Sequence, residues 1–331
     1  MKKVLIVTEA NESVASGHLF ECLVLCTELK DAVLLVNHDI PDKLRDRLPE
    51  NVCYYEKNIQ EESEILIGII RKEMVEVVLF NLREIKQDFI LNLRICYNGK
   101  VVCIDEFGNR RLDADVIINP MIGNKYWNYL DSQGRVIKGH EYLILPSKLN
   151  EYNLQNKVIR ENINTITVSM GGIDYYNSTL KIVDWLLMMQ FSGVINIVLG
   201  AGYRYIDELN SCIKGIKNCK VVQDIDYLYD LFLESDLAFC AGGNTLHELA
   251  AIGTPTIIVP TMPHELENAI EFQNRGFGIA CVLSKELDIG DLDDAYSLVK
   301  DYRKRDNMSI SGKLIVDGLG YVRVSDVLES L

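Results

Sequence analysis

Apolar runs of strand length alternate with amphipathic segments of helix length along most of the chain. Such alternation is typical of parallel sheets covered by helices. In the first half it predicts strands over 3–7, 32–36, 75–80, 101–104 and 116–118, with helices near 18–29 and 63–72. In the second half it predicts strands over 165–170, 195–199, 220–222, 237–240 and 256–259.

The pattern stops and starts again once, which indicates two domains. The stretch 150–164 is polar without a sustained period, and 331 residues are more than one core usually supports. We therefore predict an α/β fold of two Rossmann-like parallel-sheet domains facing a cleft at the carboxyl ends of the strands, where ligands of such sheets bind. We place these domains at 1–150 and 151–310, and expect the tail 311–331 to pack back on the first.

Composition narrows the class of protein. Hydrophobic residues make up 48% and charged residues 25%, as in a globular protein. A net charge of −14 argues against a broad basic surface for nucleic acid. Because no apolar run approaches the ~20 residues of a spanning helix and no export signal opens the chain, we expect no membrane insertion and a cytoplasmic location. The nine cysteines include no C-x-x-C pair, so we expect reduced core thiols and no metal site.

The most informative motif joins a strand to a helix through a glycine pair. Gly242 and Gly243 let backbone N–H groups approach an anion. A helix starting near Asn244 or Thr245 directs its positive end at a phosphate. Glu248 follows about one turn later, where its carboxylate could accept hydrogen bonds from a ribose diol. An ordinary βαβ corner with a solvated acid has the same pattern.

Two further elements belong to the same predicted edge. Gly171 and Gly172 form a second glycine turn after a strand, although a tight turn before a helix would use the same residues. Strands separated along the chain can bring both turns to one rim. After a later strand, His264 and Glu265 could contact a sugar or phosphate, and Asn268 could cap a helix or bind. An exposed turn is the alternative for His264.

His18 opens the helix after the first strand, next to Gly17. Beside the positive end of a helix an imidazole tends to stay neutral, which leaves one ring nitrogen free to take a proton from water. A capping or loop histidine is the alternative. Asp105 follows another strand of this half, where it could meet the glycan part of a ligand. Acids after strands are also commonly solvated.

Taken in order, these elements resemble the nucleotide-sugar hydrolases of the pseudaminic acid pathway, UDP-2,4-diacetamido-2,4,6-trideoxy-β-L-altropyranose hydrolases, and the related spore coat polysaccharide biosynthesis proteins. The likeness spans nearly the whole chain. Its matching segments are 16–18, 104–106, 115–120, 139–145, 170–174, 241–255 and the closing 317–324.

The resemblance implies a GT-B-like fold, a catalytic first domain on the sugar side and a nucleotide-binding second domain, with no cofactor or metal required. The histidine at position 18 would activate the water that attacks the anomeric carbon and releases UDP. The remaining matched positions divide by ligand group: Gly171, Gly172, Gly242, Gly243, Asn244 and Thr245 would surround the diphosphate, Glu248 the ribose, and Ile225 the uracil.

Three departures from the family pattern concern the sugar. Glu21 and Pro146 stand where arginines are usual, and His264-Glu265 replaces an Asn-Gln pair. Because a carboxylate accepts hydrogen bonds and cannot donate them, we expect a change in the sugar substituents that are tolerated.

The leading hypothesis is therefore a hydrolase of a UDP-linked acylamino-deoxy sugar in nonulosonic acid or surface polysaccharide biosynthesis. Two alternatives use the same scaffold. One is a GT-B glycosyltransferase in which His18 deprotonates an acceptor hydroxyl, and the other is a non-catalytic nucleotide-sugar-binding protein. The sequence leaves the oligomeric state open.

Overall fold

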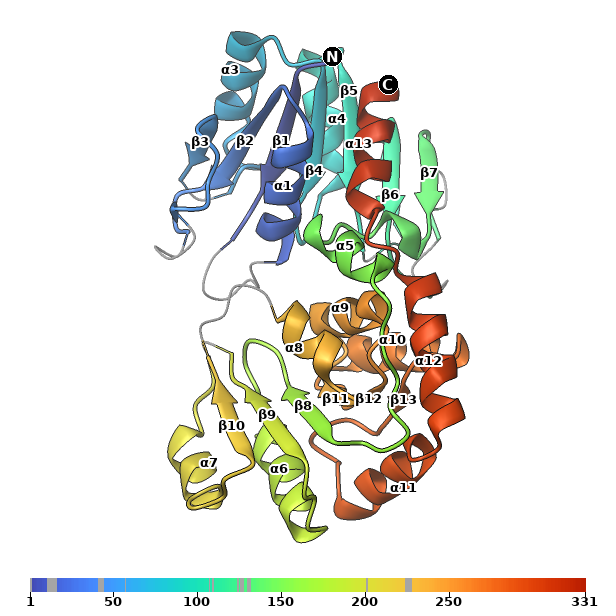
Figure 1. Ribbon diagram of the computed structural model, residues 1–331. Coiled ribbons are helices and arrows are strands. Elements are labelled where there is room, and N and C mark those ends of the chain that lie inside the picture. Colours follow the sequence, from blue (N-terminus) through green and yellow to red (C-terminus); the bar gives the residue numbers. More distant parts are fainter. Residues whose placement is uncertain are drawn as a thin grey trace. The chain divides into compact units, whose positions relative to one another are not determined.

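The computed structural model (Figure 1) describes residues 2–10, 17–40, 45–56, 58–106, 108, 110–123, 125, 128–129, 132–200, 202–223 and 228–331. The chain divides into two compact units. Unit 1 comprises Met1–Ser147 and Gly318–Leu331, and unit 2 comprises Lys148–Asp317. Each unit is built around one parallel sheet with helices, which confirms the predicted pair of Rossmann-like α/β domains.

The sheet of unit 1 has seven strands in the order β3-β2-β1-β4-β5-β6-β7. Its order reverses between β1 and β4, which pair in register up to Thr8 against Asn81. Ligands of open parallel sheets bind beside the strands where the order reverses. The strands are β1 Val4–Thr8, β2 Ala32–Asn37, β3 Val52–Tyr55, β4 Val77–Asn81, β5 Lys100–Ile104, β6 Val116–Asn119 and β7 Arg135–Lys138.

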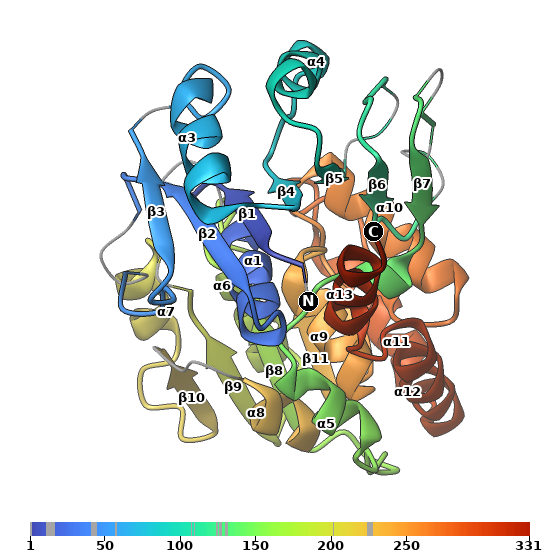
Figure 2. The ribbon, with the colours of Figure 1, turned by 90° about the horizontal axis from the view of Figure 1, so that it is seen from above.

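Helices cover both faces of this sheet (Figure 2). Helices α1 (Gly17–Glu28) and α13 (Gly320–Ser330) pack on one face, and α3 (Ser63–Glu73) and α4 (Gln87–Cys96) pack on the other. Strands β1 and β4 are therefore buried throughout, which explains why their sequences are apolar up to the last residue. The closing helix α13 contacts α1 and the short helix η1 (His140–Tyr142).

The sheet of unit 2 has six strands in the order β10-β9-β8-β11-β12-β13. Its order reverses between β8 and β11, where Ser169 lies opposite Cys240 at the carboxyl ends. The two glycine turns follow these two strands directly. The strands are β8 Thr165–Ser169, β9 Val194–Val198, β10 Cys219–Val222, β11 Leu237–Cys240, β12 Thr256–Ile258 and β13 Ile279–Ala280.

The helices of unit 2 form two groups. Helix α9 contacts α5, α8 and α12, whereas α6 contacts α7 and α11. Since α6 connects β8 to β9 and α9 connects β11 to β12 in the opposite direction, right-handed crossovers place them on opposite faces. The bounds are α5 Lys148–Leu154, α6 Ser178–Met188, α7 Ile206–Cys212, α8 Tyr229–Glu234, α9 Asn244–Ile252, α10 Pro263–Asn274, α11 Ile289–Val299 and α12 Tyr302–Ile315.

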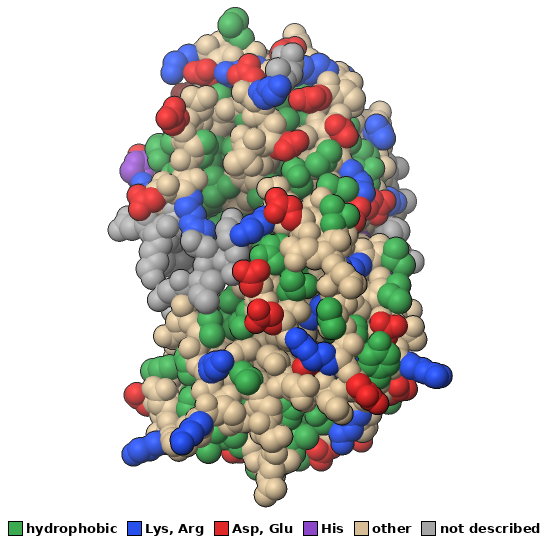
Figure 3. All heavy atoms as spheres, in the orientation of Figure 1, with side chains coloured by type: hydrophobic (Ala, Val, Ile, Leu, Met, Phe, Trp, Pro, Cys, Tyr) green, Lys and Arg blue, Asp and Glu red, His purple; other side chains and the backbone are tan. Residues whose placement is uncertain are grey.

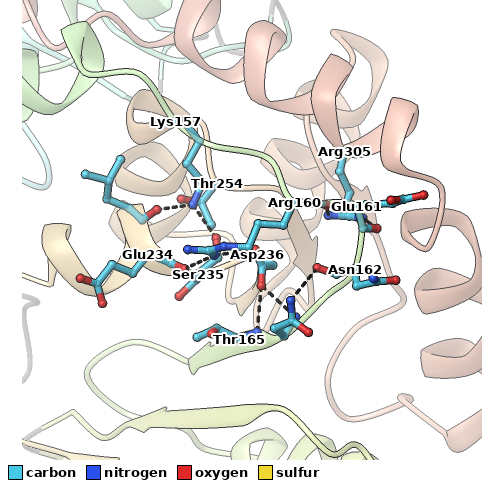
Figure 4. Close-up of polar contacts among 12 residues, drawn as sticks. Lys157, Arg160, Glu161, Asn162, Thr165, Glu234, Ser235, Asp236, Thr254 and Arg305 are labelled. Atoms are coloured by element: carbon cyan, nitrogen blue, oxygen red, sulfur yellow. Dashed lines mark hydrogen bonds and ion pairs between the residues drawn. The ribbon is translucent and has the colours of Figure 1, made fainter.

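Charged side chains, most of them buried, cross-link the amino-terminal edge of the unit 2 sheet (Figure 4). Asp236 accepts hydrogen bonds from the backbone N–H groups of Asn164 and Thr165, at 2.8 and 2.9 Å. It also forms an ion pair with Arg160 at 2.8 Å. These bonds fix the chain where it enters β8. We call Lys157, Arg160, Asp236 and Arg305 the amino-edge network.

The two other cations of this network bind backbone carbonyls. Arg305, which is 0% exposed, donates to the carbonyl oxygens of Val299, Arg160 and Glu161, at 2.9, 2.7 and 2.6 Å. Lys157 Nζ donates to three carbonyls at 2.5 to 3.1 Å, at the end of α8 and just beyond it. Burial lowers the pKa of Lys157 to about 7.

The structure also shows where the charged side chains and the cysteines lie. Lysine and arginine side chains lie scattered among acidic ones on the face shown in Figure 3. Within the described part of the chain, no helix is long and apolar enough to cross a membrane. All nine cysteines are free thiols, and burial raises the pKa of Cys22 and Cys240. The described residues contain no cluster of three His, Cys, Asp or Glu side chains that could hold a metal ion.

Candidate functional site

The two glycine turns lie side by side at the carboxyl edge of the unit 2 sheet, because β8 and β11 are neighbours. Gly171 has a φ of 82°, a left-handed conformation that favours glycine. Nothing lies within 4 Å of the position of a Cβ on either Gly171 or Gly172. The backbone of this turn is therefore accessible to a ligand.

A glycine segment after β9, which the sequence analysis missed, supports the first turn. Gly202 donates its N–H to the carbonyl of Gly172 at 3.0 Å. A Cβ on Gly200 would lie 2.4 Å from the carbonyl oxygen of Gly171. Only glycine permits so close an approach of two backbones. The signal was present in the sequence, because glycines follow the predicted strand 195–199.

The helices that follow the two turns differ at their amino ends. Buried Asp174 accepts hydrogen bonds from the N–H groups of Ser178 and Thr179, at 2.9 and 2.7 Å, and so occupies the amino end of α6. Helix α9 begins at Asn244, as predicted, and its N-cap residue Gly243 supplies no side-chain acceptor. The helix dipole and the first N–H groups therefore favour an anion at α9.

Helix α10 holds the second glycine turn from the side. Asn268 donates to the carbonyl of Gly242 at 3.3 Å. A Cβ on Gly242 would lie 2.5 Å from the carbonyl oxygen of Glu265. One turn of α10 is thus packed directly against the candidate anion site. His264, the second residue of α10, is exposed.

The two carboxylate oxygens of Glu265 have different surroundings. Its Oε2 accepts the N–H and the hydroxyl of Thr261 at 2.7 and 2.5 Å, and the N–H of Met262 at 3.3 Å. This closes the first turn of α10. Its Oε1 would lie 3.4 Å from a Cβ on Gly243. An acceptor beside the glycine turn is suited to hydroxyl or amide groups rather than to phosphate.

Glu248 lies on α9, about one turn from its amino end. Burial raises the pKa of its carboxyl to about 7, and a hydrogen bond with Tyr229 of α8 opposes that rise. The structure thus brings Gly171, Gly172 and the segment 242–248 together on one edge of unit 2. Ile225, predicted to lie against the uracil, is outside the described residues.

In unit 1, Gly17 and His18 are the first two residues of α1. Nδ1 of His18 lies 2.9 Å from Oδ1 of Asn81, the last residue of β4 and 0% exposed. Because an amide oxygen can only accept, this contact requires that the proton of a neutral imidazole lies on Nδ1, which leaves the lone pair on Nε2. His18 is therefore held beside β1 and β4, where the strand order of unit 1 reverses.

Glu21 forms a hydrogen bond with the NH2 group of the same Asn81 side chain. Its Oε2 accepts from Nδ2 of Asn81 at 2.8 Å. Only 9% of Glu21 is exposed. Burial and, secondarily, the negative charge of Glu106 raise its pKa to about 8, while the hydrogen bond from Asn81 opposes the rise. The sequence analysis missed Asn81, although a polar residue directly after the predicted strand 75–80 was a visible signal.

Asp105, the residue expected to meet the sugar, is 1% exposed and has several polar partners within unit 1. Its Oδ1 forms an ion pair with Arg110. Its Oδ2 accepts from the N–H of Gly108 at 3.1 Å and from the hydroxyl of Tyr129 at 2.9 Å. Both oxygens of Asp105 therefore have partners within unit 1.

Comparison with known families finds a match within unit 2. Residues 165–313 match the glycosyltransferase family 28 C-terminal domain. The chain is 21% identical to the spore coat polysaccharide biosynthesis protein SpsG of Bacillus subtilis over 327 residues, 95% of this chain and 94% of SpsG. It is also 25% identical to an uncharacterized protein of Methanocaldococcus jannaschii over 272 residues, 78% of this chain but only 55% of that protein.

Solved structures share the fold over the whole chain. MurG of Acinetobacter baumannii matches with a TM-score of 0.72 and 14% identity, over 99% of this chain and 100% of MurG. The UDP-GlcNAc 2-epimerase of Neisseria meningitidis, solved bound to UDP-GlcNAc, matches with a TM-score of 0.66 and 13% identity, over 99% and 100%. These likenesses confirm the predicted GT-B-like fold.

Proposed function

We propose that the protein hydrolyses a UDP-linked acylamino-deoxy sugar to free sugar and UDP, in nonulosonic acid or surface polysaccharide biosynthesis. The observation that carries this proposal is the contact of 2.9 Å between Nδ1 of His18 and Oδ1 of Asn81, which in a neutral imidazole leaves the lone pair on Nε2. Nε2 takes a proton from water while the water oxygen attacks the anomeric carbon. The bond from that carbon to the diphosphate breaks, and its electron pair leaves with UDP.

The nucleotide half of the substrate is assigned to unit 2. The N–H groups of the two glycine turns and the uncapped start of α9 stabilise the departing diphosphate. Glu248 accepts hydrogen bonds from the ribose, and Oε1 of Glu265 accepts from a sugar substituent. The family 28 match of this unit and the UDP-GlcNAc bound in a protein of the same fold support a UDP-sugar.

A glycosyltransferase is the second candidate, because residues 165–313 match a glycosyltransferase domain. In that reaction His18 would remove the proton of an acceptor hydroxyl instead of water. Hydrolysis needs no acceptor, so release of UDP from the substrate alone separates the two functions.

The test is to incubate the protein with UDP-, CMP- and GDP-linked acylamino sugars, without acceptor, and to follow nucleotide and sugar by NMR. We expect UDP release, reduced by about 100-fold or more in His18→Ala, the scale of a lost general base. His38→Ala, which removes an exposed histidine of the same unit, should retain the activity. Binding of UDP without turnover of any sugar would refute hydrolysis, and turnover only after an acceptor is added would establish transfer.

A further inference from the structure

We propose that Glu21 is a positioning residue for His18, which acts through Asn81 to hold the tautomer that leaves Nε2 unprotonated. This inference rests on the proposed function, because only a base at Nε2 gives the tautomer a catalytic consequence. The three side chains form one hydrogen-bonded row, from Oε2 of Glu21 to Nδ2 of Asn81 and from Oδ1 of Asn81 to Nδ1 of His18.

The backbone fixes both ends of this row. Asn81 ends β4 opposite Thr8 of β1, in the middle of the sheet. His18 and Glu21 are three residues apart on α1, so that both side chains lie on the same face of the helix. That face meets the end of β4, and Nδ2 of Asn81 also lies 3.5 Å from the carbonyl of His18. The amide is thus enclosed between helix and strand.

An amide enclosed in this way has two orientations, and they have opposite effects on His18. With its oxygen toward Nδ1, the imidazole is protonated at Nδ1 and Nε2 can accept a proton. With its NH2 group toward Nδ1, that nitrogen must accept, so the proton moves to Nε2 and the base is lost. Glu21 selects the first orientation, because its carboxyl oxygen binds the NH2 group of Asn81 at 2.8 Å.

The identity of residue 21 therefore matters. An ionised carboxylate only accepts hydrogen bonds, so it excludes the flipped amide. A protonated carboxyl can also donate, and in that state the carbonyl of His18, 3.5 Å from Nδ2 of Asn81, favours the same amide orientation. The Glu21 arrangement therefore gives a buried acid a function that requires no contact with substrate.

The test measures the tautomer directly. Protein labelled with 15N-histidine is examined at a pH where the imidazoles are neutral, and the His18 signals are identified by their loss in His18→Ala. We expect a protonated Nδ1 and an unprotonated Nε2 in the natural protein. Glu21→Leu places an apolar side chain of similar size in the same buried position and removes the acceptor for Asn81. In this variant the two tautomers should mix. Glu21→Gln, which can both donate and accept, should give a smaller change of the same kind.

Kinetics and a control complete the test. With a substrate from the panel, kcat should fall about 10-fold in Glu21→Leu while KM changes by less than about twofold, as expected for a partner that orients a histidine. Glu28→Gln, at an exposed site on the same helix, should change neither tautomer nor kcat. A protonated Nε2 in the natural protein, or one tautomer unchanged in both Glu21 variants, would overturn the inference. Neither result depends on turnover, so failure of the proposed hydrolysis is recognised separately.

Discussion

The two edges of the unit 2 sheet differ in where their polar groups find partners. At the amino edge, Asp236, Arg305 and Lys157 are buried and bind backbone groups of the same unit (Figure 4). At the carboxyl edge, β8 and β11 are followed by glycine turns instead, and helix α9 begins without a side-chain cap. Buried charges with full sets of partners hold the chain in place, whereas accessible N–H groups are suited to a ligand.

At the carboxyl edge, helices α6 and α9 also differ in whether the chain itself occupies their amino ends. The carboxylate of Asp174 binds the first N–H groups of α6, which leaves little for an external anion. At α9 the chain supplies a glycine instead. In unit 2 the charged residues with the most polar contacts stabilise the fold. A buried charge in this unit therefore does not by itself indicate the ligand site. Variants at the two edges should affect stability and binding independently.

The largest expected effect is loss of stability at the amino edge. Arg305→Met removes the donor of three backbone carbonyls. At about 1 kcal/mol or more for each unsatisfied group, we expect the free energy of unfolding to fall by about 3 kcal/mol. Chemical denaturation measures this change, and calorimetry of the folded protein should give an unaltered affinity for UDP. The neighbouring variant Lys304→Met, at an exposed position, should change stability by less than about 0.5 kcal/mol. A weaker affinity for UDP in folded Arg305→Met would remove the distinction between the edges.

The contribution of the carboxyl edge is tested at Gly172, where a methyl group meets no atom of the protein within 4 Å. Gly172→Ala should therefore keep or slightly raise the stability. The methyl group would obstruct the approach of a diphosphate to the backbone, and we expect the affinity for UDP to fall about 10-fold, the equivalent of one charge-assisted hydrogen bond. Gly68→Ala, at an equally open position in α3, should not change the affinity. Equal affinities in the two variants would place the diphosphate elsewhere.

The sequence predicted the central strands and the edge strand β10, and it missed the other three edge strands, β3, β7 and β13. Strands β1, β4 and β11 are buried and mostly apolar, and β8 combines buried Ile and Val with Thr and Ser, so the signal of these strands is strong. Strand β3 is partly exposed, β7 is flanked by charged residues at both ends, and β13 has two residues. Short edge strands with exposed side chains lack a clear apolar period.

The candidate site was predictable where its chemistry is local in the sequence. The turn and helix over 241–253 could be identified because glycines, helix start and helix end follow one another within a few residues. Contacts between distant segments could not be identified. Arg305 binds the carbonyl of Arg160, 145 residues away, and His18 binds Asn81, 63 residues away. Asp174 illustrates the same limit, since periodicity does not show which carboxylate caps a helix.

The smallest expected effect is a pH dependence of binding at the carboxyl edge. Because the pKa of Glu248 is raised to about 7, the carboxyl is mainly protonated at pH 6 and ionised at pH 8. An ionised carboxylate accepts more strongly from the ribose hydroxyls, so affinity for UDP should rise across this range and binding should release a proton. We expect a rise about fivefold larger than in Glu248→Gln, equivalent to about 1 kcal/mol, as measured by calorimetry at both pH values.

Comparison with Glu248→Gln removes the titration of UDP itself, which is common to both proteins. The raised pKa also predicts the sign of a stability effect. Between the ordinary pKa of 4.5 and the raised pKa of about 7, the folded carboxyl keeps a proton that the unfolded chain releases. The free energy of unfolding should therefore fall as pH rises through this interval, and less so in Glu248→Gln. A pH dependence of affinity that is identical in the two proteins would place the ribose away from Glu248, even if the anion site at α9 is correct.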